Sequence, residues 1–180
     1  LVNLLHKFGW WDKVEVIKKR LLSINPSLKI ETKKIFYLPE NADSIDFTNF
    51  DYVVDAVDTV SAKLEIIARA KALNIPVISC MGTGGKLQIE RLKVCDISKT
   101  DGCPLARVMR RELKKRNISG VKVVYSDESV SFGNVLNQEK QQDDVKCKKV
   151  APPSMIFVPA VAGLYIAREV VMDLINNKAL

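Results

Sequence analysis

Apolar positions follow three different patterns in the first third of the chain. Between residues 13 and 24 they recur every three or four positions, which predicts an amphipathic helix ending at Asn25-Pro26. Residues 29–37 alternate between apolar and polar side chains, which predicts a strand. Residues 51–57 form a continuous apolar run, typical of a strand buried on both faces.

A strand–helix–strand unit begins with that apolar run. Residues 61–74 have helical spacing, and Pro76 introduces a second buried run at residues 77–81. Two buried strands joined by a helix predict a parallel sheet with a right-handed crossover.

The remaining elements predict one domain over residues 1–180 with a flexible polar loop at 129–150. The expected elements are a strand or hairpin arm at 87–96, a basic helix at 104–116, a strand at 121–125 and a final helix at 161–176. The fold class is therefore α/β, with a doubly wound, mostly parallel, Rossmann-like sheet.

Composition narrows the possible functions. A net charge of +7 favours a polyanionic partner. The 4 cysteines contain no Cys-x-x-Cys pair and His6 is the single histidine, which argues against a zinc site and a Ser-His-Asp triad. The longest apolar stretch, residues 155–167, is short for a bilayer span and no secretory signal opens the chain. We expect a soluble cytoplasmic protein without a membrane partner.

Asp55 and Asp58 lie where the first buried strand gives way to a helix. In open α/β sheets, ligands bind at the carboxyl ends of the strands, so Asp58 is a candidate ligand for Mg²⁺ on a nucleotide. The alternative is that Asp58 caps the helix and that Asp55 merely ends the strand.

Three further segments carry candidate chemistry, each with a plainer interpretation. The glycines of residues 82–85 form either a wall of the site or a simple turn, and they lack the spacing of a phosphate-binding motif. Lys13 is either a phosphate-binding cation or a solvated surface residue. Cys103 precedes a helix, where a thiol can be activated, or is simply a small residue in the lead-in.

The basic helix is a candidate surface for nucleic acid. Four cations share one stripe along it: Arg107, Arg110, Arg111 and Lys114. Their mutual repulsion is explained if phosphates neutralise them, although a solvated face remains the alternative. No aromatic residues interleave, so backbone contact is expected rather than base stacking.

Four motifs occur together along the chain: Asp55-Ala56-Val57-Asp58, Asp96-Ile97-Ser98-Lys99-Thr100, Pro104-Leu105-Ala106 and Met109-Arg110-Arg111-Glu112-Leu113. Chiefly through these motifs, the chain resembles the tRNA threonylcarbamoyladenosine dehydratase family of the ubiquitin-activating-like adenylating superfamily. The resemblance covers nearly the whole chain except the polar loop.

The resemblance implies an ATP-dependent reaction in which the carboxylate of threonylcarbamoyladenosine in tRNA is adenylated and then cyclised. It implies that Asp58 is the catalytic, Mg²⁺-binding aspartate and Lys13 the phosphate-facing lysine. We expect Gly82 and Gly84 to line the ATP site and the four cations to bind tRNA. It also implies a homodimer and leaves open a sulfur-relay or carrier-protein partner.

The chain also departs from the family pattern. The glycine-rich turn that opens the family's ATP site is absent, and Gly85 replaces a usual Asn. We therefore expect a sheet truncated on its amino-terminal side and an incomplete enzyme. The alternatives are a non-catalytic remnant or interaction protein of the same fold, and an adenylyltransferase acting on a sulfur-carrier protein.

Overall fold

The structure is a computed structural model that describes residues 12–129 and 155–178. The chain divides into two compact units, Leu1–Tyr37 and Leu38–Leu180. The predicted loop at residues 129–150 lies almost wholly outside the described residues, as does Cys147. No helix in the described part of the chain is both long and apolar enough to cross a bilayer.

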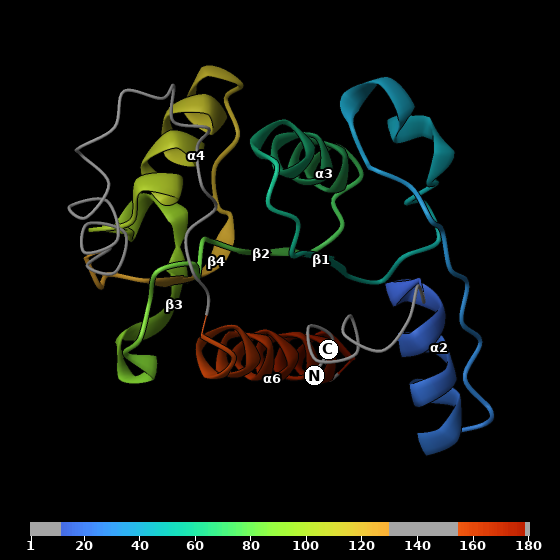
Figure 1. The fold of residues 1–180 in the computed structure, drawn as a ribbon. Helices are drawn as coiled ribbons and strands as arrows, with labels where there is room; N and C mark the ends of the chain where they lie inside the picture. Colours follow the sequence, from blue (N-terminus) through green and yellow to red (C-terminus); the bar gives the residue numbers. More distant parts are fainter. Residues whose placement is uncertain (1–11, 130–154, 179–180) are drawn as a thin grey trace, which may run out of the picture. The chain divides into compact units, whose positions relative to one another are not determined.

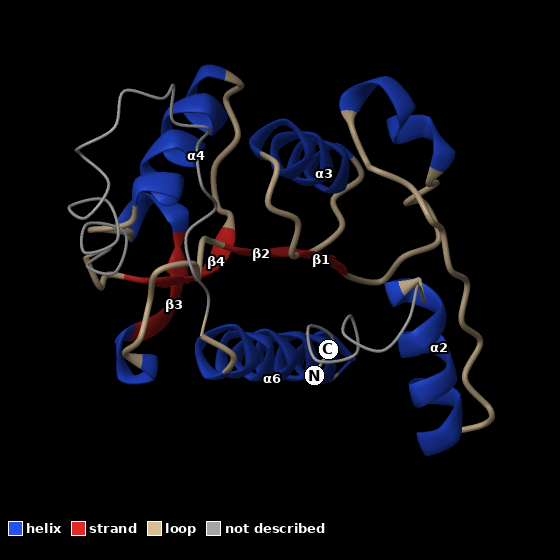
Figure 2. Cartoon of the chain, in the orientation of Figure 1, coloured by secondary structure: helices blue, strands red, loops and turns tan. Residues whose placement is uncertain are grey.

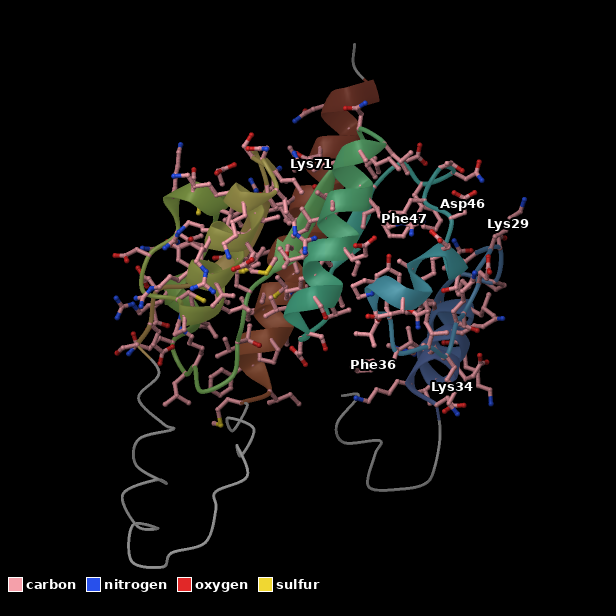
Figure 3. The ribbon with its side chains drawn as sticks, turned by 90° about the horizontal axis from the view of Figure 1, so that it is seen from above. Lys29, Lys34, Phe36, Asp46, Phe47 and Lys71 are labelled. Carbon is pink, nitrogen blue, oxygen red and sulfur yellow. The ribbon has the colours of Figure 1, made fainter. Side chains whose placement is uncertain are left out.

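The first unit consists of helix α2 (Lys13–Ile24) and an irregular segment that follows it. The helix was predicted correctly, whereas the strand expected at residues 29–37 is wrong. A strand needs a neighbour for its backbone, and this segment is instead attached to α2 through side chains. Thr32 donates a hydrogen bond to Glu15 (2.7 Å), and Lys34 pairs with Asp12 (2.7 Å). The segment can be followed in Figure 3 by the labels on Lys29, Lys34 and Phe36.

The second unit is built on a four-stranded sheet with the order β1-β2-β4-β3 (Figure 1). The strands are β1 (Val53–Asp55), β2 (Val77–Cys80), β3 (Leu92–Asp96) and β4 (Lys122–Ser126). The first three in spatial order are parallel, and β3 runs antiparallel to β4. The mostly parallel α/β sheet predicted from the sequence is therefore confirmed.

The first strand is shorter and less buried than its apolar run suggested. Only Val53–Asp55 of residues 51–57 pair with β2, and Val54 is 47% exposed. Val53 and Asp55 are buried on either side of the exposed Val54, which is the alternating pattern of a strand with one covered face. The expectation of a strand buried on both faces is wrong at this position.

Helices cover both faces of the sheet (Figure 2). Helices α3 (Val60–Ala72) and α4 (Pro104–Lys115) lie on one face, and α6 (Phe157–Lys178) lies on the other. Short 3-10 turns occupy Pro39–Ser44, Ile89–Arg91 and Ile97–Lys99. Burial of Ile78 and Val124 against Val158, Ala162 and Ile166 attaches α6 to the two central strands.

The ends of α3 and α4 follow a local rule that the sequence displays. Asn74 and Asn117 follow these helices, and both adopt the left-handed conformation with φ of 56°. Asparagine tolerates that conformation better than other residues with a side chain, so it stops a helix and redirects the chain. Both turns lead directly into strands of the parallel set.

The segment before β1 is attached to α3. Arg69 of α3 pairs with Asp43 (2.7 Å), and its guanidinium lies 5.7 Å from the ring centre of Phe47. Phe47 is buried, while Asp46 shapes the adjoining turn by accepting hydrogen bonds from Thr48 (Figure 3). These contacts fix the route by which the chain enters the sheet.

A polar clamp joins α6 to the amino ends of β1 and β4. Lys122 donates to Asp173 (2.7 Å) and Glu169 (3.1 Å), and the Tyr52 hydroxyl donates to Asp173 (2.8 Å). Partial burial alone would raise the pKa of Asp173, yet the hydrogen bonds from Lys122 and Tyr52 hold it below its usual value. Partial burial and the bond to Asp173 raise the pKa of Tyr52.

The clamp predicts an acid-sensitive contribution to stability. Because the folded-state pKa of Asp173 is depressed, its contribution is present above the unfolded pKa of about 3.9 and is lost as the pH falls through the folded value. We expect Asp173→Asn to lower the free energy of unfolding by about 1–2 kcal/mol at pH 7. Urea titrations should show that deficit shrinking as the pH falls below about 5.

The matched control is Asp51→Asn, which changes an exposed acid that makes no hydrogen bond or ion pair with any described residue. It should leave unfolding unchanged at every pH. A deficit for Asp173→Asn of equal size at neutral and acidic pH would show that the clamp acts through shape and not through charge.

Candidate functional site

The carboxyl ends of the three parallel strands bring together the polar residues of the second unit. The turn at Asp55 and Asp58 follows β1, the glycine loop of residues 82–85 follows β2, and Ser126 to Glu128 end β4. In a parallel sheet these ends share one edge, which is where open α/β folds bind ligands.

Asp55 lies in a buried ion pair. Its carboxylate is 0% exposed, and both of its oxygens lie 3.1–3.2 Å from Nζ of Lys63, itself 1% exposed. The Ser79 hydroxyl donates to the same carboxylate (2.5 Å). A buried charge of either sign is costly alone, so each partner requires the other.

Lys63 also ties two strands to a helix. Its ammonium donates to the Cys80 carbonyl (2.6 Å) and contacts the Ser79 hydroxyl (3.5 Å), in addition to Asp55. The donor belongs to α3, and the acceptors belong to the last residues of β1 and β2. One side chain therefore fixes the spacing between the acidic turn and the strand that leads into the glycine loop.

The turn after β1 presents Asp58 to solvent. The Val57 amide donates to Asp55 (3.2 Å), which shapes this turn. Asp58 is exposed and makes no hydrogen bond or ion pair with the described residues, and the helix cap is Thr59. The interpretation of Asp58 as a helix cap is therefore wrong, while Asp55 is a structural acid rather than a ligand-facing one.

The glycine loop owes its shape to one residue in particular. Gly85 has φ of 70°, a left-handed value that glycine adopts without strain because it has no Cβ atom. At Gly82 a Cβ atom would lie 3.7 Å from Leu105, an ordinary contact. Packing alone therefore does not require glycine at that position, and Gly84 has no positive φ.

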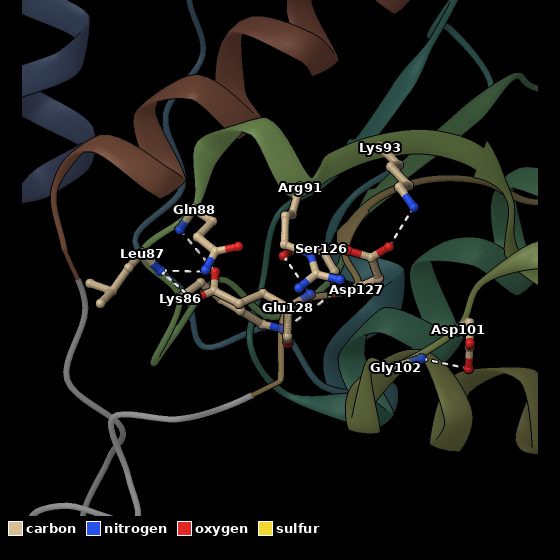
Figure 4. A network of polar contacts seen from close by, with 10 residues as sticks. All are labelled: Lys86, Leu87, Gln88, Arg91, Lys93, Asp101, Gly102, Ser126, Asp127 and Glu128. Carbon is tan, nitrogen blue, oxygen red and sulfur yellow. Dashed lines mark hydrogen bonds and ion pairs between the residues drawn. The ribbon is translucent and has the colours of Figure 1, made fainter.

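A second buried lysine holds this loop to the end of β4 (Figure 4). Lys86 is 2% exposed and donates to the carbonyls of Ser126 (3.2 Å) and Glu128. In return, the Glu128 carboxylate accepts the amides of Leu87 and Gln88 (2.9 Å each). This reciprocal clip was not predicted, because its two sides are far apart in the sequence and leave no local pattern.

The thiols at this edge are not poised as nucleophiles. Burial raises the pKa of Cys80, although Lys63 acts in the opposite direction. Cys103 precedes α4 and is 4% exposed, which favours its interpretation as a small residue in the helix lead-in. No group of three or more metal-binding side chains gathers within residues 12–129 and 155–178.

The other predicted nucleotide ligand, Lys13, belongs to the first unit. It opens α2, is exposed, and makes no ion pair with a described residue. Its proximity to Asp58 stays a prediction, because the two residues belong to different units of the chain.

The four predicted cations of α4 line a single cleft of about 870 Å³. They are not equally available to a ligand. Arg110 donates to the Thr100 carbonyl (2.6 Å) and hydroxyl, and Arg111 pairs with Glu112 (3.0 Å). Arg107 and Lys114 are exposed, and their side chains make no hydrogen bond or ion pair with any described residue. Arg110 anchors the loop before α4, and the binding of tRNA by the four cations stays a prediction.

Comparison with known proteins gives consistent matches. The model of the ThiF family matches residues 6–179. The tRNA threonylcarbamoyladenosine dehydratase of Bacillus subtilis is 38% identical over 169 residues, covering 92% of this chain and 66% of the relative. The enzyme of the same name from Haemophilus influenzae is 36% identical, covering 93% of this chain and 67% of the relative.

A solved structure extends the match to three dimensions. The E. coli tRNA N6-threonylcarbamoyladenosine dehydratase, crystallised with AMP, superposes with a TM-score of 0.75 at 25% identity. The match covers 93% of this chain and 65% of that structure. This chain thus spans about two thirds of the length of the relatives it matches.

The buried pair predicts strong energetic coupling between Lys63 and Asp55. Lys63→Met leaves a buried carboxylate without its cation, and we expect it to lower the free energy of unfolding by about 3–5 kcal/mol. Asp55→Asn should also destabilise strongly. The double variant should lose much less than the sum of the two single variants, because neither charge is then left alone.

Ser79→Ala is the control that removes a neutral partner of the pair, and it should cost about 1.5–3 kcal/mol, the usual range for a hydrogen bond to a charged group. Chemical denaturation of the four variants measures the coupling directly. Strict additivity of Lys63→Met and Asp55→Asn would mean that the two charges do not depend on one another.

Proposed function

This chain belongs to the ThiF family, among its tRNA threonylcarbamoyladenosine dehydratases, and from that membership we propose that the protein activates a carboxylate with ATP. The proposed substrate is the side-chain carboxylate of threonylcarbamoyladenosine in tRNA, which closes into a ring with loss of water. ATP supplies the adenylyl group that turns a carboxylate oxygen into a leaving group. The proposed reaction is of the ligase type.

The observation that carries the proposal is the free carboxylate of Asp58. It is exposed at the carboxyl edge of the sheet and bonded to no described residue, whereas its neighbour Asp55 is fully engaged. Carboxylate oxygens are the hard ligands that Mg²⁺ prefers. We propose that Asp58 holds the Mg²⁺ of the nucleotide, and the E. coli relative solved in complex with AMP supports nucleotide binding by this chain.

Positioning and charge stabilisation are the work of the protein in such a reaction. The Lys63–Asp55 pair holds the turn that carries Asp58, and the clip between Lys86 and Glu128 holds the loop after β2. We propose that Gly82 and Gly84 line the nucleotide site and that Lys13 contacts its phosphates. Rigid strand ends of this kind keep a catalytic carboxylate in place without rearrangement.

We further propose that the protein acts as a homodimer. The outer face of α6 carries an exposed apolar stripe at helical spacing, with Leu164 at 70%, Val171 at 52% and Ile175 at 57% exposure. An apolar helix face of this kind is typical of a surface that is covered by a partner. A second copy of this chain is the partner we propose for it.

Two finer assignments complete the proposal. We place the reaction in the cytoplasm, where tRNA and ATP are both available. We also retain a sulfur-relay or carrier protein as a candidate partner, since the carboxy terminus of such a protein presents the same reacting group. Release of AMP that depends on tRNA, and not on a carrier protein, would favour tRNA as the substrate.

The first prediction from this proposal concerns Asp58. We expect Asp58→Asn to lower tRNA-dependent release of AMP and pyrophosphate at least about a hundredfold, or roughly 2.7 kcal/mol in the barrier, because a metal ligand is lost. Its melting temperature should not change, since the native carboxylate makes no bond within the described residues. Glu90→Gln, an exposed acid without a described partner, is the control. Undiminished pyrophosphate release by Asp58→Asn would exclude a catalytic role for this residue.

The second prediction concerns assembly. Sedimentation should show that Leu164→Glu with Val171→Glu weakens self-association at least tenfold, because two charges must then be buried at the interface. Ile89→Glu places the same charge at an exposed apolar residue outside α6 and should leave assembly unchanged. Monomeric wild-type protein at micromolar concentration would refute the dimer.

A further inference from the structure

The basic cleft extends along α4 away from the proposed nucleotide edge. Gly102, just before α4, packs so closely on the Asp127 backbone that a Cβ would approach its carbonyl oxygen to 2.8 Å. The helix therefore starts at the carboxyl end of β4, and the loop after it leads into the amino end of the same strand. Its 12 residues span about 18 Å.

The cleft combines an apolar floor with a cationic wall. Ile97 and Leu113 are 4% and 1% exposed at its base. The remaining lining includes polar residues of the loop at 117–120, together with Asp96 and Ser98. Such a surface suits a ligand with alternating apolar and anionic parts, as in a chain of nucleotides.

The charge balance of the cleft is strongly positive. Four cations line it, against the single carboxylate of Asp96. That carboxylate is already engaged, since it accepts hydrogen bonds from the amide (2.8 Å) and hydroxyl (2.6 Å) of Ser98. Although partial burial acts in the opposite direction, the bonds from Ser98 hold the pKa of Asp96 below its usual value.

We propose that this cleft binds the phosphate backbone of tRNA, at a place remote from the nucleotide being modified. The inference rests on the proposed function, and it assigns the contacts more narrowly than the sequence did. The side chains of Arg107 and Lys114 have no described partner and are available to a phosphate. Arg111 is paired with Glu112, and Arg110 is bonded to Thr100 within the fold. The cleft is lined by residues 96–98 and by the loop at 117–120, next to the amino end of β4, and its cations continue along α4 as far as Arg107.

RNA fits this surface better than an acidic protein does. A phosphodiester chain carries its charges at short, regular intervals, and the free and shared cations recur on one face of α4 in the same way. Contacts of this type position a nucleic acid without reading its sequence. Docking at the cleft therefore contributes to tRNA affinity and not to the chemical step.

The test compares neighbouring cations at the end of α4. Lys114 lines the cleft, whereas Arg116 does not, and both are exposed without a described partner. Fluorescence anisotropy with labelled tRNA, from 50 to 200 mM KCl, should show that Lys114→Gln reduces the slope of log K against log salt by about 0.7–0.9. Arg107→Gln should have a similar effect. Arg116→Gln should leave the slope unchanged, and all three should melt like the wild type.

Activity measurements separate this inference from the proposed function. With saturating tRNA, Lys114→Gln should release AMP at the wild-type rate, and its KM for tRNA should rise several-fold. Absence of tRNA-dependent AMP release from the wild type would contradict the proposed function. The salt dependence of tRNA binding would still show whether the cleft binds tRNA. Equal salt slopes for Lys114→Gln and Arg116→Gln would overturn the assignment of the cleft to tRNA. A change in assembly with unaltered tRNA binding would also overturn it, and would assign the cleft to a protein partner.

Discussion

The buried ion pair between Lys63 and Asp55 is the constraint on which the carboxyl edge depends. A helix, two strand ends and the turn before the helix meet at one ammonium group, which lies within 3.2 Å of both carboxylate oxygens and 2.6 Å of the Cys80 carbonyl. Because neither charge is stable alone in the interior, the arrangement of these segments is fixed together. Asp58 has no described partner, and its position depends on Asp55, which shapes the turn by accepting a hydrogen bond from the Val57 amide.

Polar side chains have different roles at the carboxyl edge and at the amino edge of the sheet. At the carboxyl edge, buried lysines hold loops in place: Lys63 behind the acidic turn and Lys86 behind the glycine loop. At the amino edge, Lys122, Asp173 and Tyr52 attach α6, and polar contacts there serve packing. Along α4, Arg110 similarly uses its charge within the fold, which leaves Arg107 and Lys114 for a ligand.

The sequence predicted those parts of the fold whose signals are local. The helix over Pro104–Lys115 has a proline at its start and an asparagine just beyond its end, and β2 is a short apolar run after Pro76. The segment at residues 29–37 has a strand-like alternation but lacks a neighbouring strand in the structure, and alternation alone cannot supply one.

The site was less predictable because its contacts are not local. Asp58 was identified from its place at a strand end, but only the structure shows that it does not cap α3. Lys63 and Lys86 resemble any surface lysine in the sequence, although both are almost fully buried. Their acceptors belong to other strands, so no spacing rule could reveal them. The sequence likewise did not show that Arg110 is bonded to Thr100, in the loop before α4, and is therefore less available to a ligand than Arg107 or Lys114.

The most direct test of the account is a crystal structure of the protein with Mn²⁺ and a non-hydrolysable ATP analogue. We expect an anomalous peak for the metal at about 2.0–2.2 Å from a carboxylate oxygen of Asp58, near the value for the Mg²⁺ it replaces. Asp55 should still be bonded to Lys63 and Ser79. A metal bound to Asp55, or a nucleotide bound away from the carboxyl ends of β1 and β2, would contradict the role of Asp58 as the metal ligand.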